Sequence, residues 1–126
     1  MADLLSALQQ SNAGLRAQAG RLRYISENIA NADTPGYRRK TAGFVQNHDQ
    51  NGIELGPVRL DRSALRTVYD PHHPLADSDG NYSSSNVDLV IEVADAREAH
   101  RSYEANLRIF DQTRQMTESL FDLIRR

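Results

Sequence analysis

The 126-residue sequence contains no cysteine and no tryptophan. Without cysteine it has no disulfide framework and no thiolate chemistry. Five tyrosines and three phenylalanines supply all the aromatic bulk, and only 39% of the residues are hydrophobic. A compact enzyme of this length would bury more large apolar side chains. We therefore expect the apolar surface to be shared with other chains.

An excess of charge of one sign is also missing. The net charge is -2, from 15 basic and 17 acidic residues. Residues 1–34 hold three bases and three acids, residues 35–86 six and six, and residues 87–126 six and eight. No segment has the basic excess that nucleic acid or an anionic membrane selects, so we expect no nucleic-acid partner.

Several functional signals are absent as well. The N-terminal stretch lacks a basic start followed by an apolar run, so we expect no cleavable signal peptide. No uninterrupted apolar stretch approaches the roughly 20 residues of a membrane span. There is no glycine-rich phosphate loop and no serine elbow. We expect no enzyme activity, no cofactor and no small-molecule substrate.

The positions of proline and glycine divide the chain into three parts. All four prolines lie between Pro35 and Pro74, and neither proline nor glycine follows Gly80. Because proline breaks a helix interior, long helices are possible only at the two ends. We predict an N-terminal helix and turn over residues 1–34, a small irregular β-rich segment over 35–86, and a C-terminal helix over 87–126. The expected fold is mostly α, with the two long helices paired as an antiparallel coiled coil.

The first helix is expected from about Asp3, as its N-cap, to Ala32. Apolar residues recur on it at every seventh position, which is the spacing of a coiled coil. The main column is Leu8, Leu15, Leu22 and Ile29, and a companion column, Leu4, Ser11, Gln18 and Ile25, is interrupted by two polar residues. Gly14 and Gly20 each cost about 1 kcal/mol relative to alanine. Packing against a partner must therefore hold this helix.

The last helix is expected from about Asp88 to Ile124, with Ser85 or Asp88 as its cap. A helix of that length would measure about 55 Å. Its two heptad columns are Ala96, Tyr103, Phe110, Thr117 and Ile124, and Ala99, Asn106, Thr113 and Leu120, widened by Leu107 and Leu123. Asn106 in such a seam either fixes the register of the helices or faces solvent at an imperfect position.

The middle segment has strand and turn signals. Residues 52–60 alternate apolar and polar side chains. The pair Asn51-Gly52 predicts a hairpin turn, and residues 67–69 extend a small sheet. Residues 70–80 read as a loop. This loop contains two histidines and three aspartates, which are metal-ligand types, but no helical His-x-x-x-His spacing supports a metal site. A small metal-dependent hydrolase is the weakest alternative function.

The densest local motif is Asn-Ile-Ala-Asn-Ala-Asp-Thr-Pro-Gly-Tyr at residues 28–37. Pro35 disfavours the α conformation at Thr34, and Gly36 gives the turn its freedom. Asn28 and Asn31 are able to hydrogen-bond the backbone where the helix ends. The basic run at residues 38–40 that follows is expected to be a solvated turn, or to pair with acids on the C-terminal helix of a neighbouring subunit.

Together with Ser11–Leu15, this motif is similar to the N-terminal signature of flagellar rod and hook axial proteins. Residues 69–77, 86–90 and 103–106 look like the later part of the proximal rod members of that family. Ser85 and Val93 depart from the expected proline and methionine, which leaves the path of residues 78–86 open.

The resemblance implies a structural subunit of the bacterial flagellar basal body that polymerises into the tubular proximal rod crossing the periplasm. It implies copies of itself, other rod proteins, adjoining basal-body components and the flagellar type III export apparatus as partners, with export that needs no cleaved leader. A soluble adaptor with a private coiled coil is the alternative. The residues that we expect at assembly interfaces are Leu8, Leu15, Leu22, Ile25, Asn28, Ile29, Asn31, Thr34, Pro35, Gly36, Tyr37, Tyr103, Asn106, Phe110, Leu120 and Ile124.

Overall fold

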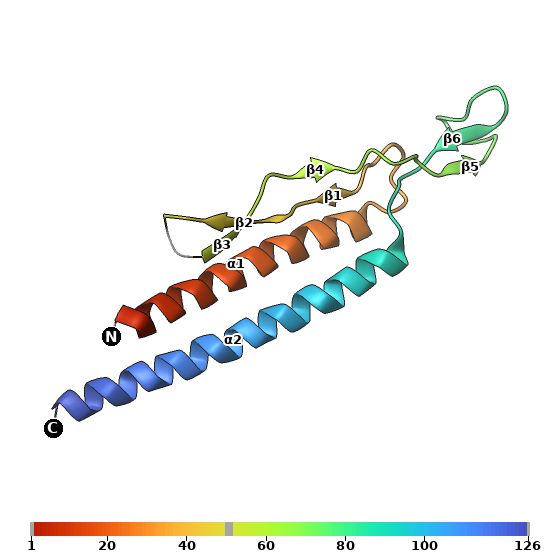
Figure 1. Cartoon of the computed structure of the whole chain (residues 1–126). Coiled ribbons are helices and arrows are strands. Elements are labelled where there is room, and N and C mark those ends of the chain that lie inside the picture. The colour runs from red at the N-terminus through yellow and green to blue at the C-terminus, as the bar shows by residue number, and fades with distance from the viewer. Residues whose placement is uncertain (1, 50–51, 126) are drawn as a thin grey trace.

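Two long helices make up most of the computed structural model, which describes residues 2–49 and 52–125 (Figure 1). Helix α1 spans Ala2–Ala30 and helix α2 spans Leu89–Arg125. They lie side by side and run in opposite directions, so that both ends of the chain lie at the same end of the molecule (Figure 1). The prediction of a mostly helical fold with long terminal helices and a small β segment between them is confirmed. Neither described helix carries an apolar stretch sufficient to span a bilayer.

The described part of the middle segment forms three antiparallel ribbons of two strands each. Strand β1 (Lys40–Thr41) pairs with β4 (Arg59–Leu60), and β2 (Phe44–Asn47) pairs with β3 (Gly52–Leu55). Strand β5 (Thr67–Tyr69) pairs with β6 (Asn81–Ser83). The first two ribbons lie along α1 on the side away from α2, whereas β5 and β6 project beyond the helix ends (Figure 1). The strands expected within residues 52–60 and 67–69 are confirmed. The predicted turn residue Asn51 lies outside the described residues.

Within the residues that the structure describes, the ribbons have no core of their own. Most of their side chains are exposed or half-buried, and the buried residues gather on the helices and on the segments that join the ribbons to them. A two-stranded hairpin is marginal in water without a surface to pack on. Leu55 shows the contact that supports β3, since its Cδ2 lies 2.8 Å from where a Cβ on Gly20 of α1 would be. The ribbons therefore depend on α1 for their place.

The start of α2 is capped by Asp88, which is one of the two residues expected there. The Asp88 side chain accepts a hydrogen bond from the Val90 backbone N–H at 3.0 Å, so Asp88 is the N-cap. The expectation for Asp3 is wrong, because α1 has already begun at Ala2. Asp3 lies instead in the first turn, where a carboxylate is stabilised by the positive end of the helix dipole.

The seam between α1 and α2 is built mainly from small and polar residues. Its buried members include Ser11, Gln18, Ile25 and Asn28 on α1, and Glu92, Ala99 and Thr113 on α2. Gly14 allows a close approach, because a Cβ there would lie 2.8 Å from the Asn106 amide nitrogen. Small side chains let the two helices come close together, and Leu8, Leu15 and Leu22 lie outside the seam.

The expectation that the Leu8 column is the main packing face of α1 is wrong. The interrupted column packs inward, whereas Leu8, Leu15 and Leu22 are only half-buried and Ile29 is 39% exposed. On α2, Tyr103 and Phe110 are half-buried at the edge of the seam, as is Asn106. Side-chain size decides the outcome, since glycine at position 14 leaves room that Asn106 fills.

The register of the two helices places the end of α2 beyond the described part of α1. Gly14 faces Asn106, Arg21 Nη2 lies 3.6 Å from Glu98 Oε2, and the Asn28 amide lies 3.3 Å from the Glu92 carboxylate. Continued at about 1.5 Å per residue, this register places Ala2 opposite about residue 118 of α2. The last turns of α2, with Leu120, Phe121, Leu123 and Ile124, extend past the described part of α1 (Figure 1).

The turn after α1 requires glycine. Gly36 has a φ of 75°, and its N–H lies 3.2 Å from the carbonyl oxygens of both Ser83 and Ser84. The expected helix stop is confirmed, since α1 ends at Ala30 and residues 31–36 form turns. Asn31 contributes as expected, because its side-chain amide donates to the Glu27 carbonyl at 2.8 Å.

We expect Gly36→Ala to lower the free energy of unfolding by about 1–2 kcal/mol, because an L-residue is strained at positive φ. Gly43→Ala is the matched control, since an added Cβ meets nothing within 4 Å at either position and only Gly36 has positive φ. Urea denaturation followed by circular dichroism measures both variants. Equal stability of the two variants would contradict the assigned role of Gly36.

Candidate functional site

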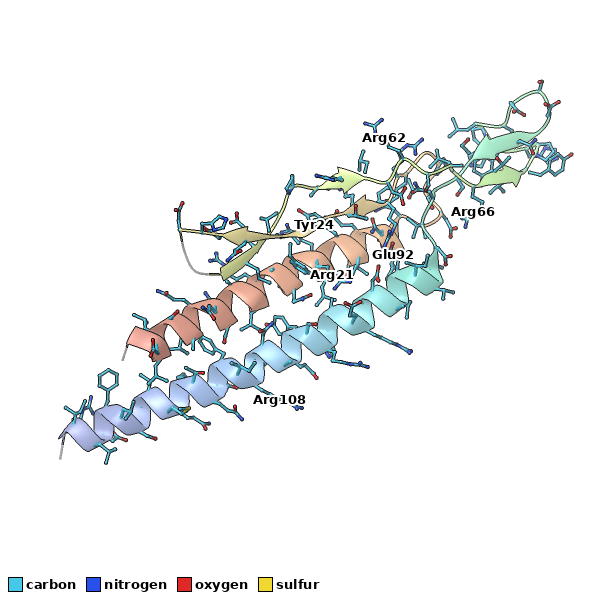
Figure 2. All side chains as sticks on the ribbon, in the orientation of Figure 1. Arg21, Tyr24, Arg62, Arg66, Glu92 and Arg108 are labelled. Carbon is cyan, nitrogen blue, oxygen red and sulfur yellow. The ribbon has the colours of Figure 1, made fainter. Side chains whose placement is uncertain are left out.

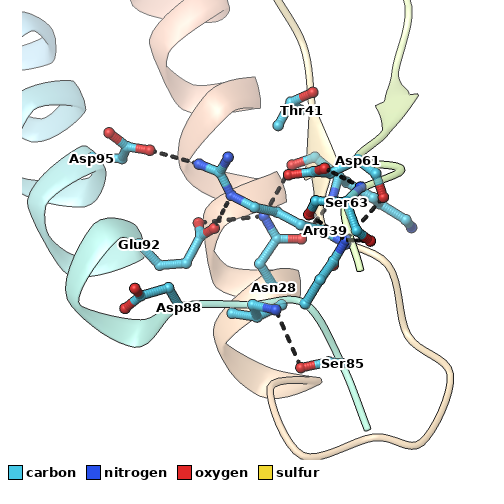
Figure 3. A network of polar contacts seen from close by, with 12 residues as sticks. Asn28, Arg39, Thr41, Asp61, Ser63, Ser85, Asp88, Glu92 and Asp95 are labelled. Atoms are coloured by element: carbon cyan, nitrogen blue, oxygen red, sulfur yellow. Dashed lines mark hydrogen bonds and ion pairs between the residues drawn. The ribbon is translucent and has the colours of Figure 1, made fainter. Parts of the chain in front are cut away.

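A cluster of polar side chains joins the end of α1, the start of α2 and the first strand of the ribbons (Figure 3). We call this cluster the polar junction and define it as Asn28, Tyr37, Arg39, Glu92 and Asp95. Its members come from segments far apart in the sequence. Asn28 and Glu92, on the two helices, are 1% and 0% exposed.

Asn28 closes the helix end onto strand β1. Its side-chain carbonyl accepts the Lys40 N–H at 2.9 Å, and its amide donates to the Lys40 carbonyl at the same distance. The carbonyl also accepts the Tyr37 hydroxyl at 2.8 Å, and the amide donates to Glu92. Burial raises the pKa of the Tyr37 phenol, which therefore stays neutral and donates. Every polar atom of this buried amide thus has a partner, as a buried amide requires.

Glu92 brings a negative charge into the interior, and Arg39 neutralises it. The Arg39 Nε donates to Glu92 Oε1, and Arg39 Nη2 lies 2.9 Å from Asp95 Oδ2 (Figure 3). Burial alone would lower the pKa of Arg39, but the hydrogen bond and charge of Glu92, with Asp95, raise it overall. The guanidinium is therefore always charged. Figure 2 shows Glu92 and Arg21 directed into the space between the helices, whereas Arg108 points outward from α2.

This geometry corrects the expectation for the basic run. Arg39 pairs with acids of the C-terminal helix, but they belong to the same chain. Lys40 lies 3.0 Å from Glu27, and Arg38 donates to the backbone carbonyls of Asp61 and Ser63. The run is a folded part of the junction rather than a solvated turn. The sequence offered acids on the C-terminal helix as partners but could not reveal which chain supplies them.

The segment that leads into α2 is tied to the same region. The Asn86 side chain accepts the Arg39 N–H at 2.7 Å and donates to the Asp61 carbonyl at 2.9 Å. The Ser85 hydroxyl donates to the Ala32 carbonyl, which is a bond that proline at this position would not make. The path of residues 78–86 is now defined by β6 and these bonds.

The loop at residues 70–80 is held by its own turns. The His73 ring stacks on Tyr82 with a centroid distance of 3.9 Å, and its Nδ1 accepts the Leu75 N–H. Asp77 accepts the N–H groups of Asp79 and Asn81. Within residues 2–49 and 52–125, no group of three or more potential ligands is arranged to hold a metal ion.

The predicted interface residues fall into three groups by exposure. Ile25 and Asn28 are buried within the chain, so they hold its own fold. The half-buried members are Leu8, Leu15, Leu22, Asn31, Pro35, Tyr37, Tyr103, Asn106 and Phe110. The exposed members are Ile29, Thr34, Gly36, Leu120 and Ile124.

Sequence reasoning gave Leu120 and Leu123 as part of the predicted seam, but it missed that Ile109 and Met116 join them in a second apolar stripe on α2. We call Ile109, Met116, Leu120 and Leu123 the α2 stripe; its members are between 39% and 65% exposed. Their spacing of 7, 4 and 3 residues is that of a coiled-coil seam beside the one that faces α1. The heptad count could have found it, because Ile109, Met116 and Leu123 form a third column. Nothing within the described chain covers this stripe.

We expect Glu92→Gln to lower the free energy of unfolding by about 3–5 kcal/mol, because Arg39 and Asn28 then lose a buried carboxylate partner. Glu98→Gln is the matched control on the same helix. Its carboxylate lies 3.6 Å from Arg21 but is 68% exposed, so the expected loss is below about 1 kcal/mol. Similar losses in urea denaturation for both variants would show that the junction does not anchor the fold.

Comparisons with known proteins give consistent results. One family model, "Flagella basal body rod protein", matches residues 5–38, and another, "Flagellar basal body rod FlgEFG protein C-terminal", matches residues 78–123. The "Flagellar basal-body rod protein FlgC" of Agrobacterium fabrum is 44% identical, over 99% of this chain and 98% of its own. The proteins of that name from Aquifex aeolicus and Salmonella typhimurium are 33% and 31% identical, over 97% and 90% of this chain and 98% and 92% of their own.

Proposed function

The chain belongs to the FlgC family of flagellar basal-body rod proteins, and from this we propose that it polymerises through its two terminal helices into the tubular drive shaft of the proximal rod. Members of this family are structural rod components and not enzymes. The observation that carries the proposal is the pair of long helices with apolar surface left uncovered by the chain itself. A shaft that transmits torque needs stiff elements along its axis, and α2 alone is about 55 Å long.

The antiparallel helix pair is proposed to act as a coiled coil. Ala99, Asn106 and Thr113 face α1 at seven-residue spacing, with Tyr103 and Phe110 at the edge of the seam. The close contact of Gly14 with Asn106 supports a fixed register, because one larger residue at position 14 would separate the helices. Asn106 is thus proposed to set the register within the chain, which settles how much of α2 is left for neighbours.

The proposed partners are copies of the chain, other rod proteins and adjoining basal-body components. Location in the basal-body rod follows from the family. That the rod segment crosses the periplasm, and that the chain reaches it through the flagellar type III apparatus without a cleaved leader, are parts of the proposal. A private adaptor coiled coil is disfavoured, because such a protein would cover the α2 stripe itself.

We expect Met116→Asp to abolish rod assembly and swimming when it replaces the natural chain in its own bacterium. Met116 is 57% exposed, so the free energy of unfolding should change by no more than about 0.5 kcal/mol. The matched control is Gln115→Asp, which places the same charge on the neighbouring exposed position and should assemble normally. Electron microscopy of isolated basal bodies and swimming in soft agar measure the result. Normal rods with Met116→Asp would contradict a role of the α2 stripe in assembly.

A further inference from the structure

The pairing of β1 with β4 and the pairing of β2 with β3 are out of step by one residue. Thr41 pairs with Arg59, and Phe44 pairs with Leu55. Phe44 follows Thr41 by three positions, whereas Arg59 follows Leu55 by four. The second strand of each pair is thus joined by one extra residue, which makes the junction between the two ribbons a β-bulge.

Two glycines lie opposite each other at this bulge. The Gly56 N–H donates to the Gly43 carbonyl at 2.7 Å, and Pro57 after it has no N–H to donate. Glycine within a strand has more backbone freedom than other residues and no side chain to pack. The ladder of hydrogen bonds is therefore weakest where the two ribbons meet.

The ribbons on either side of the bulge are held on α1 in different ways. Strand β1 is anchored, because Asn28 bonds both backbone groups of Lys40 and the Lys40 ammonium lies 3.0 Å from the Glu27 carboxylate. Among the described residues, no hydrogen bond or ion pair joins β2 or β3 to α1. Their closest support is the apolar contact of Leu55 at Gly20, directly beside the bulge.

Beyond that contact, a cleft of about 650 Å³ separates β2 and β3 from the first half of α1, beside which they lie (Figure 1). At about 30 Å³ per water molecule it has room for roughly 20 of them. Its walls include Ala13 and Arg16 of α1, and Ile53 and Leu55 of β3. Phe44 shares the face of its partner Leu55, and both Phe44 and Ile53 are 40% exposed. Apolar surface directed at α1 is thus left uncovered.

We propose that the hairpin of β2 and β3 is a strap that turns about the glycine bulge and closes onto the first half of α1. Leu55 is the pivot, since it already touches α1 beside the bulge. In the closed position Phe44 and Ile53 pack over Ala13, and water leaves the cleft. Polar groups on the α1 wall, such as the Arg16 guanidinium, retain water and oppose closing, so both positions are populated.

The position of the strap regulates how firmly the first half of α1 is held. The polar junction holds the other end of this helix, and two glycines weaken its interior. A closed strap adds a second packed flank to the one that faces α2, whereas an open strap leaves residues 9–17 accessible on that side. The hinge belongs to the single chain, so it does not depend on polymerisation.

Distances between nitroxide labels in the purified full-length chain, measured by pulsed electron paramagnetic resonance, test the strap. The chain has no cysteine, so labels attach only at introduced ones. The first pair is Gln10→Cys on α1 with His48→Cys at the far end of β2. The reference pair is Gln10→Cys with Arg59→Cys on the anchored ribbon. All three positions are exposed, and substitution there leaves the fold intact.

We expect two distance maxima for the His48→Cys pair and one for the Arg59→Cys pair. Gly43→Val should reduce the first pair to one maximum, because a β-branched side chain restricts the bulge while its Cβ meets nothing within 4 Å. The matched control Ala42→Val adds the same branching beside the glycine and should retain both maxima. A single maximum for the His48→Cys pair without these changes would overturn the strap, as would two maxima that Gly43→Val leaves unaltered.

Discussion

The buried charge of Glu92 is the constraint on which the rest of the structure depends. A carboxylate without solvent contact is stable only with partners, and here the partners are Arg39 and Asn28 from two other segments. Satisfying this one group joins the end of α1, the first strand and the start of α2. The junction therefore fixes one end of the helix pair, and the ribbons follow because they begin and end there.

Because polar bonds fix the helix pair at one end, the large apolar side chains are not all needed to hold the two helices together. Apart from Ile25, the seam uses mainly small and polar side chains, so most of the larger leucine, isoleucine and methionine side chains are left on the flanks and on the extending end of α2. A protein that must remain a monomer would bury these residues. In the function that we propose, a subunit that assembles retains them as contacts with its neighbours.

The sequence was sufficient for the elements and insufficient for their contacts. Proline and glycine placement predicted both helices, and Asp88 was one of the two candidate caps for α2, because these signals act locally. The facing of α1 was misjudged, since hydrophobicity favoured the Leu8 column while side-chain size at Gly14 decided which face packs. The pairing of Arg39 with Glu92 spans 53 residues, and no local signal reports a contact of that range. The third column on α2 was visible in the sequence but has meaning only once the other columns are seen to face α1.

Amide hydrogen exchange compares most directly the helix ends at the polar junction with the last turns of α2. We predict that in the dilute full-length chain the amides around Asn28 and over residues 92–99 exchange slowest, while α2 beyond about residue 117 exchanges fast. In isolated rods the same last turns of α2 should become protected. Uniformly slow exchange along α2 in the dilute chain, or fast exchange at its end within rods, would contradict the claim that the junction orders one end and assembly orders the other.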